Sequence, residues 1–105
     1  FKRLEQNSDV ITYKDLIINI KKSIILKDDK EILLTKNEMI IFSYLLANRN
    51  RIVTRDELMT DLWNNSEYIN DNALTVNISR LRSKLKEIGY EDIIETRKGL
   101  GYILL

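Results

Sequence analysis

The segment TVNISRLRSKLKEIG, residues 75–89, carries side chains that could bind an anion. A solvated surface helix usually mixes both signs of charge, but residues 75–86 have no acid and four cations: Arg80, Arg82, Lys84 and Lys86. Arg, Lys, Ser and Thr side chains donate hydrogen bonds to phosphate oxygens, and Arg and Asn also bind base edges in the DNA major groove. The candidate chemistry is therefore noncovalent recognition of nucleic acid. The alternative is a packed surface helix whose acid-free run has no function.

The same segment has two faces when it is drawn as a helix. At about 100° per residue, its apolar residues form one stripe that suits a protein core: Leu74, Ile78, Leu81, Leu85 and Ile88. The outward and flanking residues are small, hydroxyl-bearing or cationic, which would let the helix lie deep in a major groove: Asn72, Thr75, Val76, Ser79, Arg80, Arg82, Ser83 and Lys86. We therefore predict a helix over about residues 72–88, ended by Gly89 in a left-handed conformation.

Two capping boxes predict the helices that must position this segment. TKNE (35–38) and TRDE (54–57) each place Glu three residues after Thr, so that each side chain can bind the other residue's backbone N–H. The first helix runs to about residue 48, the second is roughly ten residues long, and together they bury Ile41, Phe42, Leu45, Leu46, Leu58, Leu62 and Trp63. The short link NRNRIV makes them a helix-turn-helix candidate. Asn70 or Asp71 can cap the third helix.

A second basic feature follows the third helix. The runs DIIET and YILL are typical of short strands, and they flank the turn RKGLG, whose glycines allow a tight hairpin. Arg97 and Lys98 stand at its predicted tip, where a cation can enter a narrow minor groove. A hairpin tip that is merely solvated is the alternative. A helix-turn-helix pair, an acid-free helix and a basic hairpin, in this order, describe a winged helix.

Residues 10–34 have a β-type pattern instead. Short Ile-rich runs alternate at Ile18 and Ile20 and again at Ile32 and Leu34, and Asp28-Asp29 suits a turn between two runs. We predict two to four short antiparallel strands here. Residues 1–8 are polar without a period and read as a linker or a frayed terminus.

Composition limits the other possibilities. The 105 residues are 44% hydrophobic and 31% charged, which is typical of one globular domain. The net charge of +1 is low for a nucleic-acid-binding domain, so any basic surface must be local. Because Cys and His are absent, the chain lacks the usual nucleophile, general base and soft-metal ligands. We expect no enzyme, no cofactor, no metal, no membrane partner and a cytoplasmic location.

Two groups of residues could suggest other functions. The acid pairs Asp28-Asp29 and Glu91-Asp92 could serve an enzyme, but they suit turns better because neither has a partner base. Trp63, Phe42 and Tyr102 could stack on single-stranded bases, but their helical or hairpin setting favours core packing.

The stretches LTKNEMIIFSYLLANRNRIVTRDELMTDLW, DNALTVNISRLRSKL and IIETRKGLGYIL together resemble the C-terminal effector domain of OmpR/PhoB-family response regulators. The stretch NDNALTVNISRLRSKLKEIG looks closest to a BceR/GraR-like branch that senses cell-envelope antibiotics and antimicrobial peptides. The resemblance implies an α+β winged helix-turn-helix in residues 10–105, with a four-stranded antiparallel N-terminal sheet, three helices and a C-terminal β-hairpin wing. Residues 1–9 would then be the remnant of an interdomain linker.

The resemblance also implies residue roles and partners. The third helix would enter the major groove of double-stranded promoter DNA with the outward residues named above. The wing would contact phosphate and the minor groove through Thr96, Arg97, Lys98 and Gly99. The loop before the third helix would contact RNA polymerase through Asn64, Asn65, Ser66, Glu67 and Tyr68. A homodimer on tandem or inverted half-sites and a receiver domain of the same chain are further implied partners.

One departure from the family limits what can be transferred. Ser79 stands where several relatives carry a base, so their preferences for DNA sequence are not expected to hold here. A winged helix that serves only protein–protein contacts is the alternative function.

Overall fold

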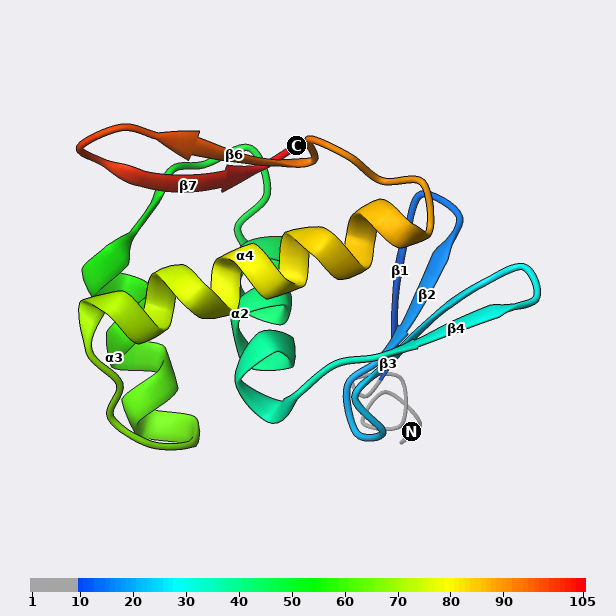
Figure 1. The fold of residues 1–105 in the computed structure, drawn as a ribbon, viewed down its shortest axis with the longest axis horizontal. Helices are drawn as coiled ribbons and strands as arrows, with labels where there is room; N and C mark the ends of the chain where they lie inside the picture. The colour runs from blue at the N-terminus through cyan, green and yellow to red at the C-terminus, as the bar shows by residue number, and fades with distance from the viewer. Residues whose placement is uncertain (1–9) are drawn as a thin grey trace, which may run out of the picture.

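A computed structural model describes residues 10–105, and the predicted linker at residues 1–9 lies outside the described residues. Along the chain come a four-stranded sheet, three helices with a short strand between the first two, and a C-terminal hairpin (Figure 1). The predicted α+β winged helix-turn-helix is confirmed. Within the described residues, no helix combines the length and the apolar character that crossing a membrane requires.

The N-terminal sheet is antiparallel, with its strands in the order β1-β2-β3-β4. The strands are β1 (Val10–Tyr13), β2 (Leu16–Asn19), β3 (Ile24–Lys27) and β4 (Lys30–Leu33). Alternation in β2 buries Leu16 and Ile18 and exposes Ile17. The Asp28-Asp29 turn forms as predicted, with a positive φ of 53° at Asp28. The sequence left the number of strands open because its turns contain neither glycine nor proline.

The three helices begin where the sequence signals them. They are α2 (Lys36–Ala47), α3 (Arg55–Asn65) and α4 (Asp71–Glu87). Both predicted capping boxes form, and their hydrogen bonds between side chain and backbone measure 2.9–3.1 Å. At the start of α4, the Asn70 Oδ1 accepts from the Ala73 N–H at 2.8 Å.

The end of α4 is a Schellman motif around Gly89. Gly89 has a φ of +91°, and its N–H donates to the Lys86 carbonyl at 3.0 Å. The Tyr90 N–H donates to the Leu85 carbonyl at 2.9 Å, which is the bond pattern of this motif. The Lys27 Nζ also donates to the Ile88 carbonyl at 2.9 Å, where a cation stabilises the negative end of a helix.

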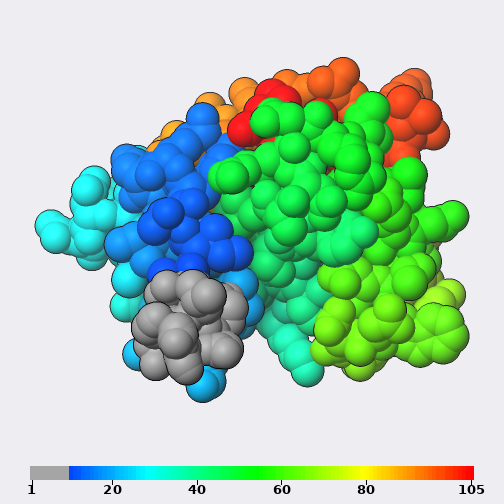
Figure 2. Space-filling model, turned by 180° about the vertical axis from the view of Figure 1, so that it is seen from behind, coloured from blue at the N-terminus to red at the C-terminus, as the bar shows by residue number. Residues whose placement is uncertain are grey.

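The core lies where α2 packs against both α3 and α4. The predicted apolar stripe of α4 is confirmed, because each of its members is at most 2% exposed: Leu74, Ile78, Leu81, Leu85 and Ile88. Burial of one such side chain contributes about 1.5–3 kcal/mol, so the stripe fixes which face of α4 points outward. In Figure 1 α4 lies in front of α2, and in the view from behind most of α4 is hidden (Figure 2).

The prediction that Trp63 is buried is wrong. Leu58 and Leu62, one helical turn apart, take the core-facing positions of α3 and are at most 1% exposed. Trp63 follows Leu62 and therefore turns about 100° away, which leaves it 67% exposed. Phe42 and Tyr102 are buried in the core as predicted.

The predicted hairpin forms, but it belongs to a larger sheet. The strands β6 (Ile94–Arg97) and β7 (Gly101–Leu104) are joined by β5 (Val53–Thr54) in the order β5-β7-β6. Strand β5 was not predicted, because two residues are too few to show alternation. A Cβ at Gly101 would overlap the Val53 carbonyl oxygen, so glycine is required where β5 approaches β7. Since β5 directly precedes α3, this pairing attaches the hairpin to the helix-turn-helix.

Candidate nucleic-acid interface

The outward face of α4 is the largest part of the candidate interface. Its exposed residues are Asn72, Thr75, Val76, Ser79, Arg80, Ser83 and Lys86. Most of these side chains are short, and Val76, which is 45% exposed, adds an apolar contact. Such a surface can enter a major groove and hydrogen-bond to phosphates or base edges. The predicted exposure of this face is confirmed, whereas the role of each residue stays a prediction.

Lys84 does not belong to this outward face. Its Nζ lies 2.6 Å from the Glu38 Oε1, and the Glu38 side chain is only 1% exposed. The same Oε1 accepts from the Thr35 N–H at 2.9 Å. One cation of the acid-free helix therefore neutralises a buried acid of α2 and joins the two helices.

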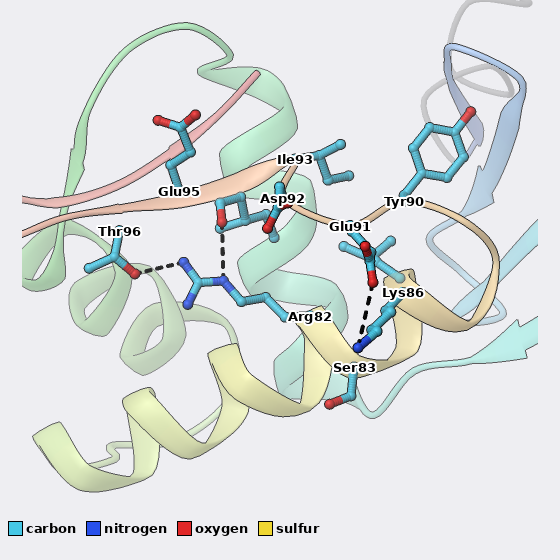
Figure 3. Close-up of a pocket in the computed structure, with 11 residues that line it drawn as sticks. Arg82, Ser83, Lys86, Tyr90, Glu91, Asp92, Ile93, Glu95 and Thr96 are labelled. Carbon is cyan, nitrogen blue, oxygen red and sulfur yellow. Dashed lines mark hydrogen bonds and ion pairs between the residues drawn. The ribbon is translucent and has the colours of Figure 1, made fainter.

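Arg82 links α4 to the hairpin. Its Nε donates to the Ile94 carbonyl at 3.1 Å, and its Nη2 donates to the Thr96 Oγ1 at 2.7 Å (Figure 3). Arg82 and Thr96 were each predicted to contact DNA, and the structure places them in contact with one another. The hairpin is thereby held beside the outward face of α4.

Arg55, the first residue of α3, was missed by the sequence analysis. Its Nη1 donates to the Tyr102 hydroxyl at 2.6 Å, and its Nη2 donates to the Asp71 carbonyl at 2.8 Å and to the Thr75 Oγ1 at 3.0 Å. It thus ties α3 to β7 and to the first turn of α4. The TRDE box drew attention to Thr54 and Glu57, and no local pattern signals a contact 47 residues away along the chain.

The ring of Tyr102 lies near two guanidinium groups. The Arg55 Cζ is 5.9 Å and the Arg82 Cζ is 5.7 Å from the ring centroid, both within the range of cation–π attraction. Tyr102 therefore connects the two arginines that attach the hairpin to α3 and α4.

The tip of the hairpin is exposed and basic. Lys98, Gly99 and Leu100 connect the strands, and Gly99 has a φ of +78°. Arg97 is the last residue of β6, and its carbonyl accepts from the Leu100 N–H at 2.8 Å. Its Nη2 also lies 3.1 Å from the Glu95 Oε1, in an ion pair whose side chains are 45% and 42% exposed. Glu95 thus offsets part of the charge at the tip.

An open groove separates the C-terminal half of α4 from β6 (Figure 3). Its polar lining includes the cations and hydroxyls of Arg82, Ser83, Lys86 and Thr96 and the acids Glu91, Asp92 and Glu95. Apolar side chains such as Ile93 and Ile94 line it as well. The Lys86 Nζ lies 3.5 Å from the Glu91 Oε2. Because both signs of charge are present, the groove itself is not an anion pocket. Other exposed cations lie on the outward face of α4, at Arg80, and at the hairpin tip, at Arg97 and Lys98.

The turn between α2 and α3 is held by a second acid. The Glu57 carboxylate binds both terminal nitrogens of Arg51, at 3.3 and 2.9 Å, and accepts from the Tyr44 hydroxyl at 3.0 Å. The Arg51 hydrogen bonds, followed by the Thr54 backbone N–H, lower the pKa of Glu57 to about 2. This cluster joins α2, the turn and the start of α3.

The loop before α4 exposes every residue predicted there. Asn64 and Asn65 end α3, Ser66 is its C-cap, and Glu67 and Tyr68 lie in the connection. Tyr68 is 68% exposed and Trp63 is 67% exposed. Two large exposed aromatic side chains at one end of α3 could contact another protein.

Within residues 10–105, no group of three or more potential metal ligands comes together.

Comparison with known sequences shows that the chain is similar to transcription regulators. Residues 29–104 match the family described as "Transcriptional regulatory protein, C terminal". The response regulator protein GraR of Staphylococcus epidermidis is 48% identical over 93 residues, which cover 89% of this chain and 42% of GraR. The chain therefore spans less than half the length of this curated relative.

Two solved structures are similar in fold and sequence. The C-terminal domain of the nisin resistance regulator NsrR, described as a lantibiotic response regulator, matches with a TM-score of 0.81 and 35% identity, covering 89% of this chain and 94% of that one. The DNA-binding domain of the response regulator AdeR, solved with an intercistronic region, matches with a TM-score of 0.73 and 26% identity, covering 89% and 95%.

Proposed function

The chain belongs to the family of C-terminal domains of transcriptional regulatory proteins, and from this premise we propose that it binds double-stranded DNA in transcription regulation. The similarity to GraR and NsrR confirms the predicted resemblance to OmpR/PhoB-type effector domains and to their GraR-like branch. AdeR, a relative of the same fold, was solved in complex with DNA, which supports the same partner here.

The observation that carries the proposal is the outward face of α4. It presents short polar side chains and Arg80 to solvent, whereas the opposite face of the helix is buried. We propose that α4 enters the major groove with the residues of this face. Arg80 is the cation best placed for base or phosphate contact, because Lys84 and Arg82 are held by Glu38 and by the hairpin.

The hairpin supplies the second contact in this proposal. Lys98 and Gly99 at the tip, with Arg97 and Thr96 on β6, would contact phosphates or the minor groove. The bond from Arg82 to Thr96 fixes the position of β6 relative to α4, so the two contacts approach the duplex as one unit. The Arg82 side chain then contributes chiefly by holding the hairpin.

Salt-dependent binding tests the proposal. Affinity of the chain for a labelled generic duplex is measured by fluorescence anisotropy over a range of salt concentrations. It should fall steeply with salt because phosphate contacts release counterions. Arg80→Ala should cost about 1–3 kcal/mol of binding free energy and reduce the salt slope by about one. Lys22→Ala, which removes an exposed cation from the β2–β3 turn, is the matched control and should change neither.

A different result would favour the alternative of a winged helix for protein contacts. Binding that responds little to salt, or an Arg80→Ala variant that behaves as Lys22→Ala does, would contradict the proposed DNA-binding face.

The relatives suggest further partners under the same proposal. Because GraR, NsrR and AdeR are response regulators, we propose that the chain acts in the cytoplasm as the effector of a two-component response regulator. Its partners would be a receiver domain and a second copy on tandem or inverted half-sites. Residues 64–68, with Trp63 beside them, would contact RNA polymerase. The exposed aromatic side chains of Trp63 and Tyr68 support this contact.

A further inference from the structure

Arg55, the first residue of α3, contacts the first turn of the proposed recognition helix and Thr75 on its outward face. We propose that Arg55 is a positioning residue that fixes the Thr75 hydroxyl as a hydrogen-bond donor toward DNA. This inference rests on the proposed function, because Thr75 belongs to the face of α4 assigned to DNA. It goes beyond that function by specifying which kind of chemical group on DNA the Thr75 hydroxyl would contact.

The guanidinium of Arg55 is held by several bonds at once. Besides the bonds to Tyr102, Asp71 and Thr75 described above, its Nε lies 3.3 Å from the Asp71 Oδ1. The Arg55 side chain is 33% exposed. A planar guanidinium bound to β7 on one side and to α4 on the other has a fixed orientation. The bond to the Thr75 Oγ1 at 3.0 Å is therefore part of a rigid arrangement.

The direction of this bond determines what the Thr75 hydroxyl can do. Arg carries only donors, whereas a hydroxyl has one hydrogen and two lone pairs. The Thr75 Oγ1 must therefore accept from Arg55, and its own hydrogen is left for another group. Because Thr75 is exposed on the outward face of α4, a group on a bound duplex can receive that hydrogen.

Arg55 also occupies a backbone carbonyl that could otherwise compete for the hydrogen of the Thr75 hydroxyl. A Thr inside a helix often donates to the carbonyl four residues earlier, which here belongs to Asp71. The Asp71 carbonyl already accepts from the Arg55 Nη2 at 2.8 Å. The same nitrogen therefore engages the Thr75 oxygen and its competing acceptor, and it favours an outward direction for the hydrogen.

The proposal specifies the chemistry of the contacted group. An outward hydroxyl hydrogen needs an acceptor, which on DNA is a phosphate oxygen or, in the major groove, a purine N7, a guanine O6 or a thymine O4. The amino groups of adenine and cytosine are donors and cannot receive this hydrogen. The outward hydrogen of Thr75 thus favours acceptor groups on DNA, whether they belong to a phosphate or to a base.

A double-mutant cycle tests the coupling. The probes are a short duplex selected by the unmodified chain from a randomised library and a scrambled duplex of the same composition. Thr75→Val removes the hydroxyl but keeps the shape, and it should weaken binding about three- to tenfold. Arg55→Gln should weaken binding of the unmodified chain by a similar factor. It should have little effect in the Thr75→Val background, because the hydroxyl that it positions is gone.

Two further arms identify the acceptor and the effect of charge. A Thr75→Val loss that is equal on both duplexes indicates a phosphate oxygen, and a loss confined to the selected duplex indicates a base edge. Arg51→Gln removes the same charge from the turn between α2 and α3, away from α4. It should weaken binding equally with and without the Thr75 hydroxyl. If thermal unfolding shows that Arg55→Gln does not fold, Arg55→Lys, which keeps the charge and loses the fork, takes its place in the cycle.

The outcomes separate this inference from the proposed function. If Arg55 and Thr75 substitutions weaken binding by independent factors, Arg55 acts by another route and the positioning role is overturned. If Thr75→Val is neutral on both duplexes, the hydroxyl donates to neither acceptor and the inference also fails, although DNA binding stands. A chain that binds neither duplex would instead overturn the proposed function itself.

Discussion

The two capping boxes have the same sequence pattern and the same local geometry, but different surroundings. In each, a Thr hydroxyl accepts from the backbone N–H of Glu at 3.1 Å, and the Glu carboxylate accepts from the backbone N–H of Thr at 2.9 or 3.0 Å. Each Glu also binds a cation outside its box, which is Lys84 for Glu38 and Arg51 for Glu57. The helix starts are therefore equivalent as far as the backbone is concerned.

The environments of the two carboxylates differ. Glu38 is 1% exposed, and its Oε2 is buried without a hydrogen-bond partner. Glu57 is 30% exposed, and both of its oxygens are bound by the Arg51 guanidinium. A buried carboxylate depends on its cation far more than one in contact with water does. A local motif thus sets where a helix begins, and the tertiary structure sets how strongly the stability of the fold depends on the ion pair of the Glu carboxylate.

Removal of the cations should show the largest difference between the boxes. Lys84→Met leaves the Glu38 charge buried and unpaired, and it should lower the free energy of unfolding by about 3 kcal/mol. This is the low end of roughly 3–5 kcal/mol for a broken buried pair, because the Lys84 side chain is 28% exposed. Arg51→Met should cost much less, because the Arg51–Glu57 pair is partly solvated. Urea denaturation of both variants measures the difference, and equal losses would contradict the role given to burial.

Removal of the capping hydroxyls should show no such difference. Thr35→Ala and Thr54→Ala each delete one bond to a helix N–H, which should cost about 1 kcal/mol. The two losses should be similar because the deleted bonds are equally long and equally local. A clearly larger loss at Thr35 in the same denaturation experiment would mean that its hydroxyl also supports the buried pair.

Acid titration should identify the contribution of Glu57. Its folded-state pKa of about 2 lies below the ordinary value of 4.5, so its ionised form is favoured by folding. That stabilisation is complete above about pH 4.5 and is lost as the pH falls toward 2. It should amount to less than about 1 kcal/mol, because the pair is partly solvated. Thermal unfolding of Glu57→Gln should show a weaker pH dependence in this range, and an unchanged profile would argue against the Arg51 pair.

The smallest effect is expected from Lys84 on DNA binding. Because its ammonium group is bound to Glu38, Lys84→Met should leave the salt slope of DNA binding unchanged when measured where the variant is folded. Arg80→Ala, by contrast, should reduce that slope by about one. A reduced slope for Lys84→Met would mean that Lys84 leaves Glu38 and contacts phosphate in the complex.

Short-range patterns accounted for most of the fold. The Thr and Glu pairs predicted the starts of α2 and α3, Gly89 predicted the end of α4, and periodicity predicted the buried stripe of α4. Each of these signals acts within a few residues, through hydrogen bonds or helical geometry. Strand β5 was missed because its two residues show no alternation, and its partner β7 lies far along the chain. Trp63 was wrongly placed in the core because its apolar type was given more weight than its position on the helix, about 100° from Leu62.

By itself, the sequence determined that residues from about 72 to 88 form a helix with a leucine side and an outward polar side, since both follow from its period. Only the tertiary structure decided which of the cations are available to a partner. Lys84 turns to the buried Glu38, Arg82 to β6, and Arg55 joins β7 to Thr75. Residue type and spacing predict on which face of a helix a charged residue lies. A long, flexible side chain, however, binds whichever partner the fold brings within its reach, and the sequence does not reveal that partner.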